Sequence, residues 1–244
     1  DHDTYNGYQH WKNTIKGKKY KDFVVLKGIE YDTLDAGHIL IIMPQGVKMR
    51  LLELRGLPLS LLIDFVHHNG GICGPAHPCG EKYLSFTNTK RWQKSPELIE
   101  KFDFINAGYH HGVPKGDMIR NPICSAGIFP SGSRQQLENR NTEMALRAIY
   151  ENPIRILTHP GDKGPFDLGE IGRACEARGT RLEINSRHSH LTVDEIRRTM
   201  NYDVTYVVSS DAHKPSQVGG VEAALERAEE AGLDFGRIVN IKER

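Results

Sequence analysis

The sequence predicts an α/β fold in which crossover helices join the strands of a parallel sheet. Short apolar segments of strand length alternate with amphipathic segments of helical length along most of the 244 residues. This alternation is typical of parallel sheets. Several apolar segments also end at a histidine or an acidic residue. In α/β barrels the site is built at the carboxyl ends of the strands, so the pattern predicts a functional site at that edge.

The expected strands are short runs rich in β-branched and other apolar residues. They lie at residues 23–26, 38–43, 72–76, 102–108, 154–157, 181–184 and 204–208. The expected helices lie at residues 57–68, 142–150, 167–178, 193–200 and 221–231. Gly179 and Gly232 are expected to end two of these helices, and Thr192 is expected to cap the start of a third.

One long segment, residues 112–134, shows neither a helical nor a strand period. It is rich in glycine, proline and serine. A loop of this length in a compact domain is typical of a lid, a binding loop or a disordered segment, and the sequence does not decide between them.

The composition is ordinary for a soluble globular protein, with 38% hydrophobic and 26% charged residues. The net charge of +1 gives no electrostatic basis for nucleic acid as the main partner. We expect no membrane span, because no apolar run approaches roughly 20 residues, and no signal peptide is visible. The cysteines are scattered, which favours free thiols and a cytoplasmic location. They are Cys73, Cys79, Cys124 and Cys175.

Lysine and arginine are unevenly distributed along the chain. Residues 1–105 contain 11 lysines and 3 arginines, whereas residues 106–244 contain 4 lysines and 14 arginines. Either residue serves on a solvated surface, so the fold does not require this division. We interpret it as a sign of different origins for the two parts, with chance as the alternative.

The clearest candidate ligands are Asp211 and His213, which follow an apolar strand. Residues two apart in a strand face the same side, so a carboxylate and an imidazole can converge there. That pair suits zinc or manganese. The alternative is a helix N-cap followed by a surface histidine. We favour the ligand interpretation, because the next segment is not helical until about Ser216.

Other histidines also follow expected strands. His159 precedes a Pro-Gly turn, so an ordinary turn residue is the alternative to a ligand. Neighbouring strand residues alternate in direction, so of His110 and His111 one is expected to face the site and the other to face solvent. His77 ends its segment in the same way as His159, and the sequence leaves open which of the two is the operative ligand.

These residues resemble the PHP family, the polymerase and histidinol phosphatase metal-dependent phosphoesterases. Residues 106–244 resemble the branch of bacterial zinc-dependent phosphatases, and residues 1–105 resemble a shorter branch that also has His38-Ile39-Leu40 and Ala76-His77-Pro78. The shared motifs are Asp1-His2-Asp3-Thr4, Gly28-Ile29-Glu30, Ala107-Gly108-Tyr109-His110, His159-Pro160-Gly161-Asp162 and Ser210-Asp211-Ala212-His213. The resemblance implies a distorted (β/α)7 barrel with up to three divalent metals, zinc or manganese.

The resemblance also implies a set of metal ligands. They are His2, Glu30, His110, His159, Asp211 and His213. Asp211 and His213 are the expected catalytic residues, together with Arg187, whose guanidinium could hold phosphate oxygens. Without the resemblance, Glu30 reads equally well as a surface carboxylate and His2 as part of a disordered terminus. We expect structural or surface roles for His38, Lys163, His188 and His190.

The chain departs from the family pattern at its start. The family begins with a strand that ends in His-x-His, whereas this sequence starts within the second motif, at Asp1. We therefore expect residues 1–244 to form a single PHP-like domain, truncated at the N-terminus, with an incomplete barrel. A join of two relatives near residue 105 would explain the two His-Pro motifs, and a natural insertion is the alternative.

The predicted function is hydrolysis of a phosphate mono- or diester through a metal-activated water. The expected partner is a phosphorylated small molecule. Two alternatives stay open at this point: a catalytically impaired PHP remnant, and a metal-dependent amidohydrolase on a similar barrel.

Overall fold

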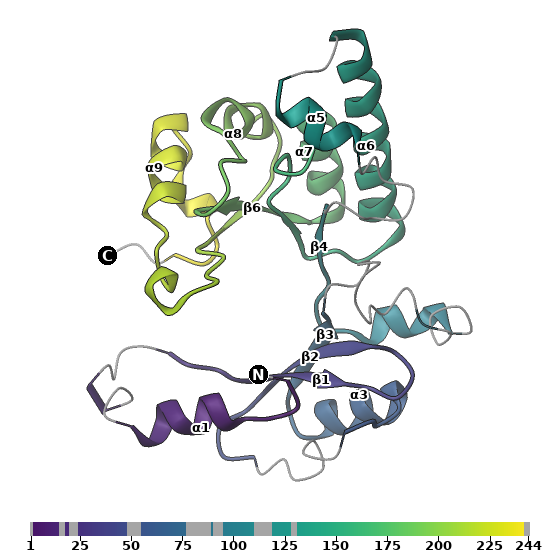
Figure 1. Ribbon diagram of the computed structural model, residues 1–244, viewed down its shortest axis with the longest axis vertical. Coiled ribbons are helices and arrows are strands. Elements are labelled where there is room, and N and C mark those ends of the chain that lie inside the picture. Colours follow the sequence, from purple (N-terminus) through teal and green to yellow (C-terminus); the bar gives the residue numbers. More distant parts are fainter. Residues whose placement is uncertain are drawn as a thin grey trace. The chain divides into compact units, whose positions relative to one another are not determined.

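The computed structural model describes residues 2–14, 18–19, 24–47, 55–76, 89, 95–109, 119–127 and 131–241 (Figure 1). The chain divides into two compact units, Asp1–Ile105 and Asn106–Arg244. The boundary falls where arginine replaces lysine as the main basic residue. The single PHP-like domain and the composite origin both stay predictions. Over the described ranges, no helix is long and apolar enough to cross a membrane.

The first unit contains a three-stranded antiparallel sheet. Its strands are β1 (Lys27–Asp32), β2 (His38–Met43) and β3 (Ile72–Pro75), in that order. The predicted parallel arrangement is therefore wrong for these strands. A tight turn joins β1 to β2, in which the Thr33 N–H donates to the Gly37 carbonyl at 3.0 Å. A parallel pair would need a crossover of about a dozen residues or more.

The position of β1 also differs from the prediction. The strand begins at Lys27, just beyond the expected residues 23–26. Burial alternates along it, and Ile29 and Tyr31 face inward. Glu30 therefore lies within the strand, and it faces the side opposite to these two residues. The predicted strands at 38–43 and 72–76 are confirmed by β2 and β3.

The helices of the first unit are α1 (Asn6–Asn13), α3 (Leu59–His68) and the 3-10 helix η3 (Pro96–Lys101). Helix α3 confirms the expected helix at 57–68 and packs against β3. Its apolar face is fully buried and consists of Leu59, Leu62, Ile63 and Val66. Helix α1 was not predicted, and it buries no side chain, so its sequence has no apolar face to reveal it.

The second unit contains a four-stranded parallel sheet with helical crossovers. The strands are β4 (Asn106–Gly108), β5 (Ile156–Thr158), β6 (Arg181–Asn185) and β7 (Tyr206–Ser209). The α/β class and the parallel sheet are confirmed here. The helices are α5 (Arg120–Ser125), α6 (Ser131–Glu151), α7 (Leu168–Arg178), α8 (Val193–Thr199) and α9 (Glu222–Ala231), with 3-10 helices η4 (Pro215–Gln217) and η5 (Phe235–Arg237).

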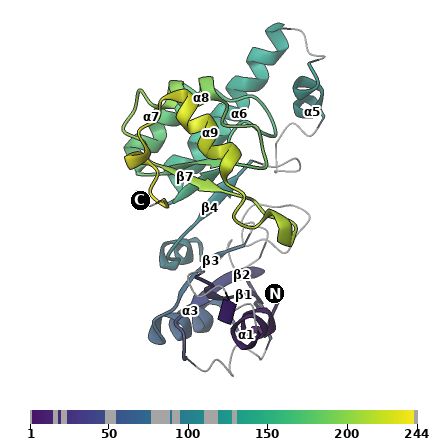
Figure 2. The ribbon, with the colours of Figure 1, turned by 90° about the vertical axis from the view of Figure 1, so that its left-hand side faces the viewer.

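The helices α6 to α9 lie side by side in chain order, and α9 also contacts β6 and β7 (Figures 1 and 2). The side chains of Leu182, Ile184 and Tyr206 are fully buried in the core of this unit. In the described residues this sheet has four strands, and the distorted, incomplete (β/α)7 barrel stays a prediction.

Local signals placed three helix ends of the second unit correctly. Gly179 and Gly232 adopt the left-handed conformation after α7 and α9. The Thr192 side chain accepts a hydrogen bond from the Glu195 N–H, and the Glu195 carboxylate accepts one from Thr192 in return. This capping box satisfies two N–H groups at the start of α8.

The expected loop at 112–134 is wrong where the structure describes it. Helix α5 lies inside it, and α6 begins at Ser131, well before the expected helix at 142–150. Asn121 of α5 is buried, and its amide donates to the Tyr109 hydroxyl at 2.8 Å. The first turns of α6 are polar apart from Leu137, so they show no apolar period from which a helix could be predicted.

Candidate functional site

The first unit gathers two carboxylates and two imidazoles at β1. Glu30 and Asp32 lie two apart on the strand and therefore share a face. His38, the first residue of β2, pairs with Asp32 in the antiparallel register. His2 forms an isolated parallel β-bridge with Glu30. The Asp3 carboxylate holds this segment in place by accepting the Asp32 N–H at 2.8 Å.

The contacts within this group are close. His38 Nδ1 lies 3.2 Å from Glu30 Oε1, and His38 Nε2 lies 3.3 Å from Asp32 Oδ1. His2 Nδ1 lies 3.3 Å from Asp32 Oδ1, and His2 Nε2 lies 3.7 Å from Glu30 Oε2. One ligand atom each of His2, Asp32 and His38 lies within 4.8 Å of the other two, so one ion could contact all three.

His38 and Asp32 were not among the predicted ligands. His38 was expected to have a structural role, yet it contacts both carboxylates of the group. The antiparallel pairing of β1 with β2 brings it there. The expectation of a parallel sheet concealed this placement, and a hairpin signal at residues 33–37 could have revealed it.

In the second unit, polar residues follow three neighbouring parallel strands. His159 follows β5, Arg187 and His188 follow β6, and Asp211 and His213 follow β7. His159 and Asp211 have left-handed backbones, with φ of 32° and 43°. Such conformations are costly for residues other than glycine and cluster at functional sites.

The His188 imidazole lies between two carboxylates. Its Nδ1 lies 2.9 Å from Asp162 Oδ1, and its Nε2 lies 3.2 Å from Asp211 Oδ2. Burial acts to raise the pKa of Asp162, but the hydrogen bond from Lys163 and the charges of His188 and Lys163 lower it below its ordinary value. Asp162 is therefore ionised at neutral pH. His188 was expected to be a plain loop residue, and only the fold reveals its two carboxylate partners.

Asp211 also lies beside Arg187 and His213. Arg187 Nη1 lies 3.8 Å from Asp211 Oδ2, and His213 Nδ1 lies 3.6 Å from Asp211 Oδ1. Arg187 Nη1 contacts both ring nitrogens of His213, with Nε2 at 2.7 Å. The three residues proposed as catalytic are thus brought together by the ends of β6 and β7.

A buried carboxylate, Glu183, supports this edge of the sheet. Its Oε2 accepts the His159 N–H at 2.7 Å and the Asn185 side-chain amide at 3.2 Å, and its Oε1 accepts the Ser209 hydroxyl. It thereby joins the ends of β5, β6 and β7. Burial lowers the pKa of His159, although the Glu183 charge opposes this effect. The isolated acid between Leu182 and Ile184 was the available sequence signal.

Arg227 of α9 fixes the loop that carries Arg187 and His188. Its guanidinium donates to the carbonyls of Asn185, His188 and Leu191, the last at 3.0 Å. The Asn185 side chain also accepts the N–H groups of Arg187 and His188, at 2.9 and 3.1 Å. The loop therefore has a defined conformation.

The predicted ligands fall into separate groups. His2 and Glu30 meet in the first unit, and Asp211 meets His213 in the second. The ring of His159 lies 5.2 Å from that of His188. Within the described ranges, no set of three ligand atoms close enough to share one ion includes Asp211. His77, His110 and His111 lie outside the described residues, and the single multi-metal site stays a prediction.

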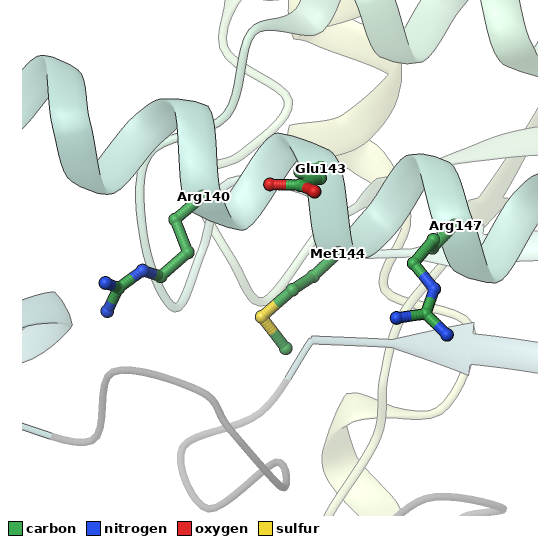
Figure 3. Close-up of a pocket in the computed structure, with 4 residues that line it drawn as sticks. All are labelled: Arg140, Glu143, Met144 and Arg147. Atoms are coloured by element: carbon green, nitrogen blue, oxygen red, sulfur yellow. The ribbon is translucent and has the colours of Figure 1, made fainter.

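A hollow on α6 contains none of the predicted residues. It is lined by Arg140, Glu143, Met144 and Arg147 (Figure 3). Arg147 Nε lies 3.1 Å from Glu151 Oε1, so this guanidinium is paired on the helix surface.

Comparison with known proteins gives distant relatives with a common description. No family model matches the chain. Proteins named probable phosphatase from Shewanella sp. (strain ANA-3) and Serratia proteamaculans (strain 568) are each 24% identical, over 59% and 60% of this chain. The alignments cover 53% and 56% of those proteins, so the chain spans about half their length. A probable phosphatase from Thermoanaerobacter sp. (strain X514) is 23% identical over 85% of this chain and 87% of its own.

Proposed function

We propose that this protein is a metal-dependent phosphoesterase of the PHP kind, which hydrolyses the phosphate ester of a small molecule. The observation that carries the proposal is the contact of Asp211 with Arg187, His188 and His213 at the ends of two parallel strands. The relatives named probable phosphatase support a phosphatase activity in general. The PHP assignment, the metal and the type of ester are parts of the proposal.

The donor set of the first unit fits a divalent metal. His2, Glu30, Asp32 and His38 offer two imidazoles and two carboxylates, the ligand types that zinc and manganese take in proteins. Three of these residues have ligand atoms close enough to share one ion. When bound, such a metal would lower the pKa of a coordinated water from about 15.7 to about 7.

The residues of the second unit suit the charge and the hydrolysis of a phosphate ester. The Arg187 guanidinium holds phosphate oxygens, since its planar fork matches their geometry, and Asp211 orients it. His213 Nδ1 donates to the Asp211 carbonyl at 2.8 Å, with the proton assigned to that nitrogen. Nε2 then carries the lone pair and lies 2.7 Å from Arg187 Nη1. Once the phosphate oxygens take over this guanidinium, Nε2 is the atom that accepts a proton from the attacking water. The His213 side chain is 58% exposed, so substrate can reach it.

A steady-state assay tests this division of roles. The purified chain is loaded with Mn²⁺ or Zn²⁺ and assayed with p-nitrophenyl phosphate. We expect Arg187→Lys mainly to raise KM, because a single ammonium replaces a bidentate contact, and His213→Gln mainly to lower kcat. Arg173→Lys, at an exposed arginine of α7, is the matched control and should change neither.

Two other results would redirect the proposal. Hydrolysis of amides without hydrolysis of phosphate esters would support the amidohydrolase. A folded sample that binds well below two metals per chain and turns over no ester would support an impaired remnant. A chain with full metal occupancy that does not hydrolyse p-nitrophenyl phosphate would contradict the proposal.

A further inference from the structure

We propose that His67, Cys73 and Asp103 form a zinc-type metal site in the first unit, distinct from the residues already described. His67 lies in the last turn of α3, Cys73 lies in β3, and Asp103 follows η3. One ligand atom of each residue lies within 4.8 Å of the other two. Thiolate, imidazole and carboxylate are the groups that bind zinc in proteins.

Existing hydrogen bonds hold the carboxylate in position. Asp103 Oδ2 accepts the Cys73 N–H at 2.7 Å and lies 2.9 Å from His67 Nε2. The Asp103 N–H in turn donates to the Cys73 carbonyl at 2.9 Å. The backbone bonds keep the carboxylate beside β3 whether or not an ion is bound, and such supporting contacts orient the ligands of known metal sites.

The site is open on one side and closed on the other. Cys73 is fully buried, whereas the side chains of His67 and Asp103 are 39% and 32% exposed. An ion can therefore enter past the imidazole and the carboxylate, and a water can complete a tetrahedral shell. Burial and the Asp103 carboxylate raise the pKa of the Cys73 thiol to about 12, so a bound ion must displace the thiol proton, as at other thiolate sites.

The thiol distinguishes this site from other groups in the described part of the chain. Cys124 and Cys175 are also buried, but neither belongs to a cluster of three ligating side chains there. The group formed by His2, Asp32 and His38 contains no sulfur. Among the described cysteines, a signal from a sulfur–metal bond therefore reports on Cys73, and its loss in Cys73→Ser would exclude Cys79, which lies outside the described residues, as the source.

Cobalt titration of the full chain tests the site directly. Co²⁺ bound to a thiolate gives a sulfur-to-cobalt charge-transfer band in the near ultraviolet. We expect this band in the unmodified chain and its loss in Cys73→Ser. His67→Gln should weaken Co²⁺ binding by more than about tenfold, since even outer-shell changes cost that much.

Two variants serve as matched controls. His68→Gln alters an exposed histidine next to His67 on the same helix, and Cys175→Ser alters another buried thiol. Both should retain the band. If Cys73→Ser fails to fold by circular dichroism, the pair His67→Gln and His68→Gln carries the test.

Absence of the charge-transfer band in the cobalt-loaded chain would overturn the inference. So would its survival in Cys73→Ser, or an equal loss of binding in His67→Gln and His68→Gln. Hydrolysis of p-nitrophenyl phosphate is measured on the same samples. Because the inference concerns other residues, it stands or falls independently of the phosphoesterase proposal.

Discussion

The two units bring polar residues together in different ways. In the first unit, an antiparallel hairpin places His38 opposite Asp32, so the cluster depends on strand register. In the second unit, parallel strands end at one edge, and His159, His188 and Asp211 come from the loops after them.

This difference indicates where each cluster is vulnerable. A register-dependent cluster is lost when the turn is altered, because a slip of one residue turns every side chain to the other face. A cluster at strand ends depends instead on the groups that hold the ends together. In the second unit those groups are Glu183 and Arg227.

The largest expected effect is at Glu183 in the second unit. Glu183→Gln replaces a buried carboxylate with an amide. The carboxylate oxygens accept hydrogen bonds from His159, Asn185 and Ser209. We expect a loss of about 3 kcal/mol in the free energy of unfolding, measured by urea denaturation with amide hydrogen exchange as the probe of this unit. Glu176→Gln, at an exposed carboxylate that accepts the Asp203 N–H, is the control and should cost well under half as much.

The turn of the first unit gives the next largest effect. Gly37 has φ of 72°, and a Cβ in that region costs about 1–2 kcal/mol. Gly37→Ala should therefore destabilise the first unit by that amount and weaken metal binding by His2, Asp32 and His38. Tryptophan fluorescence follows this unit, because both tryptophans precede residue 106.

A matched glycine substitution in the second unit separates the effect of backbone strain from the effect of strand register between β1 and β2. Gly179 after α7 has φ of 66°, so Gly179→Ala should cost a similar free energy. It should leave metal affinity unchanged. If both glycine variants lowered metal affinity equally, the register explanation would be wrong.

A smaller and pH-dependent effect is expected at His190. Its hydrogen bond to Glu195 raises the pKa of His190 above 6.5, despite burial. For Glu195, burial acts to raise the pKa, but the bonds from His190 and Thr192 lower it below 4.5. The pair therefore stabilises the second unit fully between about pH 4.5 and 6.5.

The comparison of His190→Gln with the unmodified chain measures this window. The difference in unfolding free energy should be about 1 kcal/mol near pH 5.5. It should shrink as the pH rises through the raised pKa of His190, and again as the pH falls through the lowered pKa of Glu195. A difference that stays constant from pH 5 to 9 would exclude the proposed ionisation.

The smallest effect is expected on the surface of α6. Arg147→Ala removes an i,i+4 pair with Glu151 in which both side chains are more than half exposed. We expect a change of about 0.3–0.5 kcal/mol at most, measured by thermal unfolding. A loss above 1 kcal/mol would show that Arg147 has a role beyond this ion pair.

The sequence predicted the second unit better than the first. Thr192, Gly179 and Gly232 were correctly identified as helix ends, because caps are local signals. The parallel order of β4 to β7 followed from the strand–helix alternation. The pairing of β1 with β2 depends on contacts between separate segments, so local signals do not predict it. In a parallel sheet, His38 would not lie opposite Asp32, and it was therefore not expected at the site.

Part of the candidate site also escaped prediction for physical reasons. The position of Glu183 between apolar neighbours shows its burial but not its partners, which come from β5 and β7. Asp103 likewise lies far along the chain from Cys73 and His67. Helix α1 buries no side chain, so neither periodicity nor burial could reveal it.

The most direct test is the hydrolysis of p-nitrophenyl phosphate by the metal-loaded chain and by its Asp211→Asn variant. The Asp211 carboxylate contacts Arg187, His188 and His213, so it holds these three side chains at the proposed site. The account predicts metal-dependent turnover that chelation abolishes, and a kcat at least about 100-fold lower in Asp211→Asn, with Asp194→Asn unchanged. Equal turnover by Asp211→Asn and the unmodified chain, both folded and metal-loaded, would contradict it.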